Sequence, residues 1–358
     1  MRTRTVQIIA AALLAFMVFG ACSGASVAHA AAADAWTGIP RGWRLAGSIG
    51  DSKASYAIQA DIRIINSQVM GEYYYLSSGK LLEIYGDLKG TAFDASEYER
   101  WDHVTGKWTG KIDMATGRVT GTWTSPDESR SFSIALEPVA SYVWDARVEH
   151  RIVDVDSSLP VFSARTRIAS SAEDLAASVS AAAQKAALAD LPLEYAPDPS
   201  DPDRGDQRWA VSTFGKVVYW SDSVISMMHE IYTFSGGAHG MTAYESINTW
   251  MQNGTPKRVY LQDVLLNGSG YQKAIEKHIL ADLKAQGAAF VASGEVQSVP
   301  EESLERFVLL PKGIAFYFGP YEMGSYAEGV YVSIVPWKTL TPYLNANGPA
   351  ADLMKVKF

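Results

Sequence analysis

Short segments of β-forming residues alternate with turn residues along the first third of the chain. Residues 69–76 and 81–85 are rich in Tyr, Leu and Ile, and the Ser-Ser-Gly-Lys tetrapeptide between them predicts a hairpin turn. Residues 132–136 place Phe, Ile and Leu on one face of a strand and Ser and Ala on the other. Since this region shows no helical periodicity, we expect an all-β antiparallel module over residues 36–140, closed as a small barrel or a sandwich.

One short motif occurs twice in this module. Residues 105–109 read Thr-Gly-Lys-Trp-Thr, and residues 120–124 read Thr-Gly-Thr-Trp-Thr. Gly117 lies between the two copies, where a glycine is free to take a positive φ angle in a turn. The repeat therefore predicts two strands joined by a tight connection.

The periodicity changes near residue 141, and the rest of the pattern predicts an α+β domain over residues 141–358. One helix is expected from Ser171 to Leu191, and a second from Ser269, as N-cap, to Gln286. The expected inner faces are Leu175, Val179, Ala182, Ala183 and Ala186 in the first helix and Ile275, Ile279 and Leu283 in the second. The expected strands are residues 148–153, 162–166, 209–219, 223–234, 242–250, 306–310, 314–318 and 330–335. Helices packed on a largely antiparallel sheet define this fold class.

The N-terminus has the pattern of an export signal. Two arginines precede an apolar run over residues 6–19, which is too short to span a bilayer. We interpret residues 1–21 as a signal peptide, because the Phe-Gly-Ala-Cys segment that ends at Cys22 resembles a lipobox with Cys22 as the lipidated residue. Cleavage after Ala30 is the alternative. Residues 22–35, rich in Ala, Ser and Gly, are expected to form a flexible tether.

Charge and cysteine usage narrow the possible functions. The formal net charge is −8, and removal of the two arginines of the signal would make it −10. An acidic protein is unsuited to nucleic acid and suited to a basic partner. Cys22 is the only cysteine, so an intramolecular disulfide and a cysteine zinc site are excluded. We expect a periplasmic lipoprotein that contacts the membrane only through its anchor at Cys22.

A glycine-rich segment is the first candidate binding element. Gly236, Gly237 and Gly240 surround His239 between two expected strands. Three glycines in five residues indicate positive φ angles or a close approach of the backbone to another group. The segment is either a bulged hairpin whose histidine caps nearby carbonyls or a recognition edge. The histidines and carboxylates around His239 do not have the spacing of a standard metal site.

An aromatic loop is the second candidate. Residues 316–329 combine Tyr321 and Tyr326 with Glu322 and Glu328 among Gly and Pro residues. Tyrosine rings stack and donate hydrogen bonds, while glutamates pair with Arg or Lys. Such a loop suits a basic protein surface or a sugar ring, although packing against the core is the alternative.

The catalytic motifs that the chain resembles are incomplete. A string like that of zinc proteases begins at His229, but Thr233 stands where the second histidine ligand is required. The enzymatic alternative is a hydrolase that acts on the cell wall and uses His239 as a base together with Asp263 or Glu322. We expect neither catalytic residues nor a metal or cofactor.

The two candidate segments together resemble a known domain. Residues 236–240 and 316–329 are similar to parts of the extracytoplasmic domain of the lysozyme-sensing anti-sigma factors of Gram-positive bacteria, which is also found beside some peptidoglycan deacetylases. The resemblance covers about residues 148–344 and includes the passage around Leu261 and Asp263. It implies a module that binds lysozyme or accompanies an envelope enzyme without being catalytic. We expect the chain to depart from the anti-sigma factors by lacking their sigma-binding segment and membrane-spanning helix, and we expect no deacetylase domain.

These observations favour an exported, non-catalytic binding protein that recognises lysozyme or peptidoglycan. A hydrolase would require His239 and a carboxylate within hydrogen-bonding distance in one concave site. A binding protein would instead present an exposed aromatic and acidic patch. The two alternatives therefore make different structural predictions.

Overall fold

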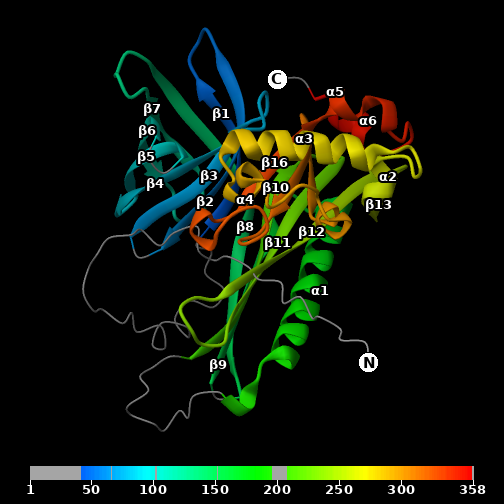
Figure 1. Cartoon of the computed structure of the whole chain (residues 1–358). Coiled ribbons are helices and arrows are strands. Elements are labelled where there is room, and N and C mark those ends of the chain that lie inside the picture. Colours follow the sequence, from blue (N-terminus) through cyan, green and yellow to red (C-terminus); the bar gives the residue numbers. More distant parts are fainter. Residues whose placement is uncertain (1–41, 66, 101–102, 151, 196–207, 357–358) are drawn as a thin grey trace, which may run out of the picture.

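The computed structural model describes residues 42–65, 67–100, 103–150, 152–195 and 208–356 (Figure 1). The expected signal peptide, the tether, the lipidation site at Cys22 and the first residues of the β-module lie outside these ranges. Within them, no helix is both long and apolar enough to cross a membrane.

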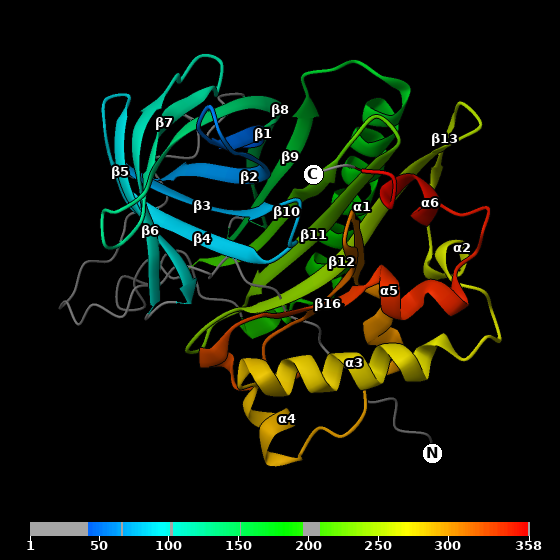
Figure 2. The ribbon, with the colours of Figure 1, turned by 90° about the horizontal axis from the view of Figure 1, so that it is seen from above.

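Eight antiparallel strands form a closed barrel. They are β1 (Gly42–Gly50), β2 (Ser55–Ile65), β3 (Gln68–Tyr75), β4 (Leu81–Lys89), β5 (Ala92–Arg100), β6 (His103–Ile112), β7 (Val119–Thr124) and β8 (Ser131–Glu149). Each strand pairs with the next one along the chain, and β1 also pairs with β8, which closes the sheet (Figure 2). The predicted all-β module is confirmed as a barrel, and its alternating inward side chains form a separate buried core.

A glutamate lies inside this barrel. Glu97 is only 2% exposed, and the register of β5 against β6 shifts directly after it. Its Oε2 atom accepts hydrogen bonds from the Tyr73 hydroxyl at 2.5 Å and from the indole nitrogens of Trp108 at 3.0 Å and Trp123 at 2.7 Å. Its Oε1 atom accepts a bond of 2.7 Å from the Thr105 hydroxyl. The carboxylate therefore connects four side chains at the centre of the module.

The barrel strand β8 continues past residue 140 into the second half of the structure. There it pairs with β9 (Val153–Phe162), and the sheet extends through β10 (Trp209–Trp220), β11 (Val224–Phe234), β12 (Met241–Gln252) and β13 (Thr255–Arg258). Strand β10 is parallel to β9, whereas the other neighbours in this sheet are antiparallel. The expected α+β class with a largely antiparallel sheet is confirmed.

The two ends of β9 differ from the two strands predicted there. The sequence predicts a strand over residues 148–153, but β8 ends at Glu149 and β9 begins only at Val153. His150 between them has a φ of 50°, which a continuous strand does not tolerate. The predicted strand over residues 162–166 is likewise the end of β9 followed by a loop.

Helix α1 (Arg167–Asp190) packs on one face of strands β9 to β12. It begins four residues before the predicted Ser171, because the Thr166 hydroxyl caps it by accepting from the Ala169 N–H. Val179 is buried as predicted, but Ala182 and Ala186 are exposed. The inner face includes polar residues instead, since the Gln184 amide donates to the Asp156 carbonyl.

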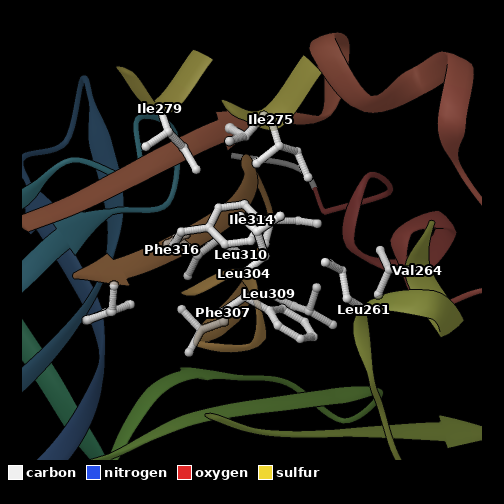
Figure 3. Close-up of a cluster of buried hydrophobic side chains, with 14 of the residues drawn as sticks. Leu261, Val264, Ile275, Ile279, Leu304, Phe307, Leu309, Leu310, Ile314 and Phe316 are labelled. Atoms are coloured by element: carbon white, nitrogen blue, oxygen red, sulfur yellow. The ribbon is translucent and has the colours of Figure 1, made fainter. Parts of the chain in front are cut away.

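The opposite face of the main sheet is covered by a smaller sheet, and helix α3 (Tyr271–Gln286) packs on that smaller sheet. The smaller sheet consists of β14 (Phe307–Leu310), β15 (Gly313–Phe318) and β16 (Tyr331–Pro336). Ile275, Ile279 and Leu283 of α3 are fully buried, as predicted, and the first two point toward β14 and β15 (Figure 3). The shorter helices are η2 (Leu193–Tyr195), α2 (Leu261–Val264), α4 (Ala289–Ser293), η3 (Glu301–Glu305), η4 (Tyr326–Glu328), α5 (Trp337–Leu340), η5 (Thr341–Tyr343) and α6 (Ala350–Leu353).

The imidazole of His229 is buried on the face of the sheet that α1 covers. It lies on the same face of β11 as Met227, which packs with residues of α1. Its side chain is fully buried, and neither ring nitrogen has a hydrogen-bond partner among the described residues. Burial lowers the pKa of His229 to about 4. The imidazole is therefore neutral in the native protein at ordinary pH.

This burial should make the protein sensitive to acid. Between pH 6.5, near the ordinary histidine pKa, and pH 4, the unfolded chain binds a proton at residue 229 and the native protein does not, so stability falls as the pH falls, by about 3 kcal/mol in total. We expect His229→Leu to abolish this loss and to be nearly neutral at pH 7.5, because no hydrogen bond is removed. Urea unfolding at pH 7.5 and at pH 4 measures the change in the free energy of unfolding for each protein.

The exposed His103 provides the control, since His103→Gln should leave the acid loss unchanged. Burial raises the pKa values of Glu83 and Asp156 to about 7, so the stability that these two groups contribute is lost as the pH rises instead. Each variant is therefore compared with the wild-type protein at the same pH. An acid loss in His229→Leu equal to that of the wild type would contradict the assignment.

Candidate functional site

The predicted glycine-rich segment forms the hairpin between β11 and β12. Thr233 and Met241 are the last pair of the ladder, so the loop begins directly after them. Gly236 and Gly237 have φ angles of 95° and 91°, which confirms the positive φ expected from the sequence. Gly240 is buried, and a Cβ atom there would lie 2.3 Å from the Tyr232 ring. The glycines thus allow a tight turn that holds His239 in place.

The predicted aromatic loop connects β15 to β16. Tyr321 lies in this loop with a φ of 67°, a conformation that costs energy for a residue with a side chain, and it is 49% exposed. The short helix η4 follows, with Ser325 as its N-cap residue. The backbone therefore holds one tyrosine outward at some conformational cost, and such strained positions are concentrated at functional sites.

The two loops meet in an aromatic cluster of His239, Tyr321 and Tyr326. The His239 and Tyr326 rings stack with centroids 3.7 Å apart and planes inclined by 17°. The Tyr321 hydroxyl lies 3.3 Å from His239 Nε2, and the two tyrosine rings are 5.7 Å apart. The other imidazole nitrogen, Nδ1, lies 2.9 Å from the Gly240 carbonyl and completes the placement of the ring. The structure thus brings together three of the predicted binding residues from segments about eighty residues apart.

The hydroxyl of Tyr326 is the polar group that this ring brings to the cluster. It is buried and has no hydrogen-bond partner among the described residues. Burial raises the pKa of Tyr326, and the neighbouring Tyr321 adds to the effect. The phenol therefore stays protonated beside the stacked rings.

The side chain of Glu322 forms an ion pair within the protein. Its two carboxylate oxygens accept hydrogen bonds from both terminal nitrogens of Arg306, at 2.6 and 2.5 Å, and Oε1 also accepts from the Gly319 N–H at 3.1 Å. Arg306 immediately precedes β14. Its pairing with Glu322 fixes the aromatic loop to the core in a bidentate geometry. Sequence reasoning missed this arginine, because only the fold places it opposite the loop.

Glu328 also has a structural role. Its carboxylate accepts hydrogen bonds from the N–H groups of Ala289 and Ser325 and from the Tyr331 and Ser325 hydroxyls, at 2.8 to 2.9 Å. Burial opposes the charged form, but these hydrogen bonds lower the pKa of Glu328 to about 2. The carboxylate is thus ionised throughout the ordinary pH range and holds the end of the aromatic loop.

The carboxylates suggested for a hydrolase make contacts other than with His239. Asp263 accepts hydrogen bonds from Lys257 Nζ at 2.7 Å and from the Tyr260 N–H at 2.9 Å. Glu322 is paired with Arg306, whereas His239 contacts Tyr321 and the Gly240 carbonyl. Within the described ranges, no three His, Cys, Asp or Glu side chains form a group that could hold a metal ion. The cluster presents stacked rings and hydroxyls rather than a base beside an acid.

Two family models match consecutive parts of the second half of the chain. Residues 147–242 match a model described as Deacetylase PdaC, and residues 262–338 match one described as protein of unknown function DUF3298. His239 lies in the first match, whereas Tyr321 and Tyr326 lie in the second. These matches indicate a cell-envelope-associated protein of unknown function. The chain matches no curated protein sequence.

Solved structures similar to this chain include two members of the DUF3298 family. One, from Pseudomonas aeruginosa PAO1, is 19% identical over 58% of this chain and 94% of its own, with a TM-score of 0.40. The other, from Bacteroides fragilis NCTC 9343, is 17% identical over 61% of this chain and 96% of its own, with a TM-score of 0.38. Two stretches within residues 147–338 are thus similar to the PdaC and DUF3298 domains, whereas the narrower likeness to the lysozyme-sensing anti-sigma factors stays a prediction.

Proposed function

We propose that this chain is an exported, non-catalytic binding protein of the cell envelope and that the aromatic cluster is its recognition site. The main observation in support is the stack of His239 on Tyr326 beside the exposed, backbone-strained Tyr321. Rigid aromatic side chains give a large contact area at a low cost in entropy and dominate binding energies at protein interfaces. The similarity to PdaC and DUF3298 supports the location in the envelope.

The partner that this proposal favours is a basic protein such as lysozyme. The acidic net charge of −8 would attract such a protein over a distance, while the tyrosines of the cluster would supply specific contacts. A glycan of the cell wall is the second candidate, because the same ring faces can stack on sugars.

Retention on immobilised hen egg-white lysozyme tests the proposal. We expect the purified protein to be retained in about 20 mM salt and largely released in about 500 mM salt, because salt screens the attraction between opposite charges. Tyr321→Ala should weaken retention by roughly tenfold or more, as expected for a central aromatic contact. Tyr195→Ala is the matched control, since Tyr195 is a 75% exposed tyrosine of η2, outside the cluster.

The results of these experiments distinguish lysozyme from a glycan as the partner and show whether the aromatic cluster is the recognition site. Absence of retention at low salt would remove lysozyme, and retention on purified peptidoglycan that depends on Tyr321 would then identify a glycan. Equal retention of Tyr321→Ala and the wild type would mean that the cluster is not the recognition site. Turnover of muropeptides by the wild-type protein, lost in His239→Ala, would favour the hydrolase instead.

A further inference from the structure

Three Asn-Gly pairs occur in the chain, at Asn253, Asn267 and Asn347. In such a pair the backbone nitrogen of the glycine can attack the side-chain amide of the asparagine, because glycine has no Cβ atom to shield this nitrogen or to restrict the backbone. The reaction also requires the asparagine backbone to rotate until the nitrogen reaches Cγ. The local structure therefore decides which of the three pairs can react.

The pair at Asn253 is held in the hairpin between β12 and β13. Asn253 and Gly254 have φ angles of 50° and 77°, and Gln252 pairs with Thr255 directly across the turn. Two positive φ angles are the mark of a type I′ turn, whose twist matches that of the two strands. Arg167 of α1 also donates to the Gly254 carbonyl at 3.4 Å. Rotation within this turn would therefore disturb contacts with both the ladder and the helix.

The pair at Asn347 is held by hydrogen bonds and by packing. The Gly348 N–H donates to the Asn345 carbonyl at 2.9 Å, and the Asn347 N–H donates to the Asn345 side-chain oxygen at 3.1 Å. Gly348 is buried, and a Cβ atom there would lie 2.4 Å from the Asp263 carbonyl oxygen. The attacking nitrogen is thus already bonded, and its surroundings leave little room for the backbone to turn.

The pair at Asn267 has neither restraint. Asn267 and Gly268 are exposed in the connection between α2 and α3, on the side of the molecule opposite the barrel (Figure 2). Gly268 has a φ of 73°, and apart from its chain neighbours no described atom lies within 4 Å of the place of a Cβ atom. Ser269 closes the turn, since its N–H and its hydroxyl donate to the Leu266 carbonyl at 3.2 and 2.6 Å. No described backbone group accepts a hydrogen bond from the Gly268 N–H.

We propose that Asn267 is a site of spontaneous deamidation in the native protein and that the fold protects Asn253 and Asn347. The Gly268 nitrogen bonds to Cγ of Asn267, the bond from Cγ to the amide nitrogen breaks, and ammonia leaves with the proton that the Gly268 nitrogen loses. Water then opens the resulting cyclic imide at either carbonyl, which yields an aspartate or an isoaspartate. Each product carries a new carboxylate, so the formal net charge changes from −8 to −9.

The site is separate from the aromatic cluster. Helix α3 has 16 residues, which corresponds to about 24 Å of length. Asn267 precedes this helix, whereas Ala289, whose N–H donates to Glu328 of the aromatic loop, follows it. The proposal is therefore independent of the proposed function, and its test requires no ligand.

Peptide mapping by mass spectrometry measures the conversion of each pair separately. The full-length protein is incubated in mildly alkaline buffer, which favours loss of the proton from the attacking nitrogen, and is then digested at acidic pH. We expect Asn267 to be converted at least about tenfold faster than Asn253 or Asn347, which corresponds to about 1.4 kcal/mol in activation free energy. The same protein incubated in urea is the control, because unfolding frees all three pairs and should remove most of this difference.

Two variants assign the product to one residue. Asn267→Gln should remove the acidic species that ion-exchange chromatography resolves after incubation, whereas Asn347→Gln should leave it unchanged. Equal conversion of the three pairs in the native protein, or faster conversion of Asn253 or Asn347, would overturn the proposal. So would an unmodified Asn267 in the native protein under conditions that convert it in the urea-unfolded chain.

Discussion

Replacing Glu97 by leucine should lower the free energy of unfolding by about 4 kcal/mol, which is close to the largest effect of a single substitution in most proteins. The reason is the number of donors that lose their acceptor. The Tyr73 hydroxyl and the indole nitrogens of Trp108 and Trp123 all donate to one carboxylate oxygen in the buried barrel core. Each buried donor left unsatisfied costs about 1–3 kcal/mol, and bonds to a charged acceptor are the stronger ones.

Chemical unfolding followed by tryptophan fluorescence measures this effect. Glu97→Gln should be less damaging, because its amide oxygen can still accept at the same place. The control is Glu137→Gln, which removes a 64% exposed carboxylate of β8 that pairs with Arg118 and should change stability by less than about 1 kcal/mol. Equal stability of Glu97→Leu and Glu137→Gln would show that the three donors find other acceptors.

The barrel shows which part of this network the sequence could predict. The repeated Thr-Gly-x-Trp-Thr motif predicts two strands, and β6 and β7 place Trp108 directly opposite Trp123. Their common acceptor lies on β5, which has no copy of the motif. The alternation of β5 places Glu97 on the same inward face as Phe93 and Ala95, but it does not show which donors of other strands will meet the carboxylate. Glu97 could therefore be identified only once the strands were paired.

Helix α1 illustrates a second limit of the hydrophobic pattern. The predicted inner face follows alanines, but the side chains that reach the sheet include Ser180 and Gln184. Ser180 lies 2.6 Å from the Thr213 hydroxyl, and Gln184 also donates to that hydroxyl at 3.2 Å. Polar residues can be buried where they find partners, and those partners come from a strand distant in sequence. The periodicity therefore predicted the helix, but the inner face that it predicted is rotated about the helix axis relative to the observed one.

The sequence predicted which two segments form the candidate site, but it did not predict all of the contacts that their side chains make. The glycines and aromatic residues were sufficient to select both loops, and the structure places His239 against Tyr321 and Tyr326. The glutamates between these aromatic residues bind groups of the protein itself. Glu322 pairs with Arg306, and Glu328 accepts hydrogen bonds from backbone N–H groups that would otherwise lack a partner. Glu322 and Glu328 thus hold the loop in place through contacts within the protein.

The pairing of Arg306 with Glu322 should also have a large effect on stability. The two side chains are only 13% and 27% exposed, so removing one partner leaves a poorly solvated charge. We expect Arg306→Met to lower the free energy of unfolding by about 3 kcal/mol. Glu322→Gln should cost less, about 1–2 kcal/mol, because its amide oxygen can still accept from the Gly319 N–H and from one nitrogen of Arg306.

The double variant Arg306→Met/Glu322→Gln distinguishes a true pair from two independent side chains. Once the arginine is absent, replacing the glutamate removes an unpaired charge instead of a partner, so the double variant should be more stable than Arg306→Met alone. Denaturant unfolding of all four proteins gives the coupling energy, expected at about 2 kcal/mol. Additive losses would mean that water screens this ion pair as it screens a surface pair. The aromatic loop would then owe its position mainly to the hydrogen bonds of Glu328.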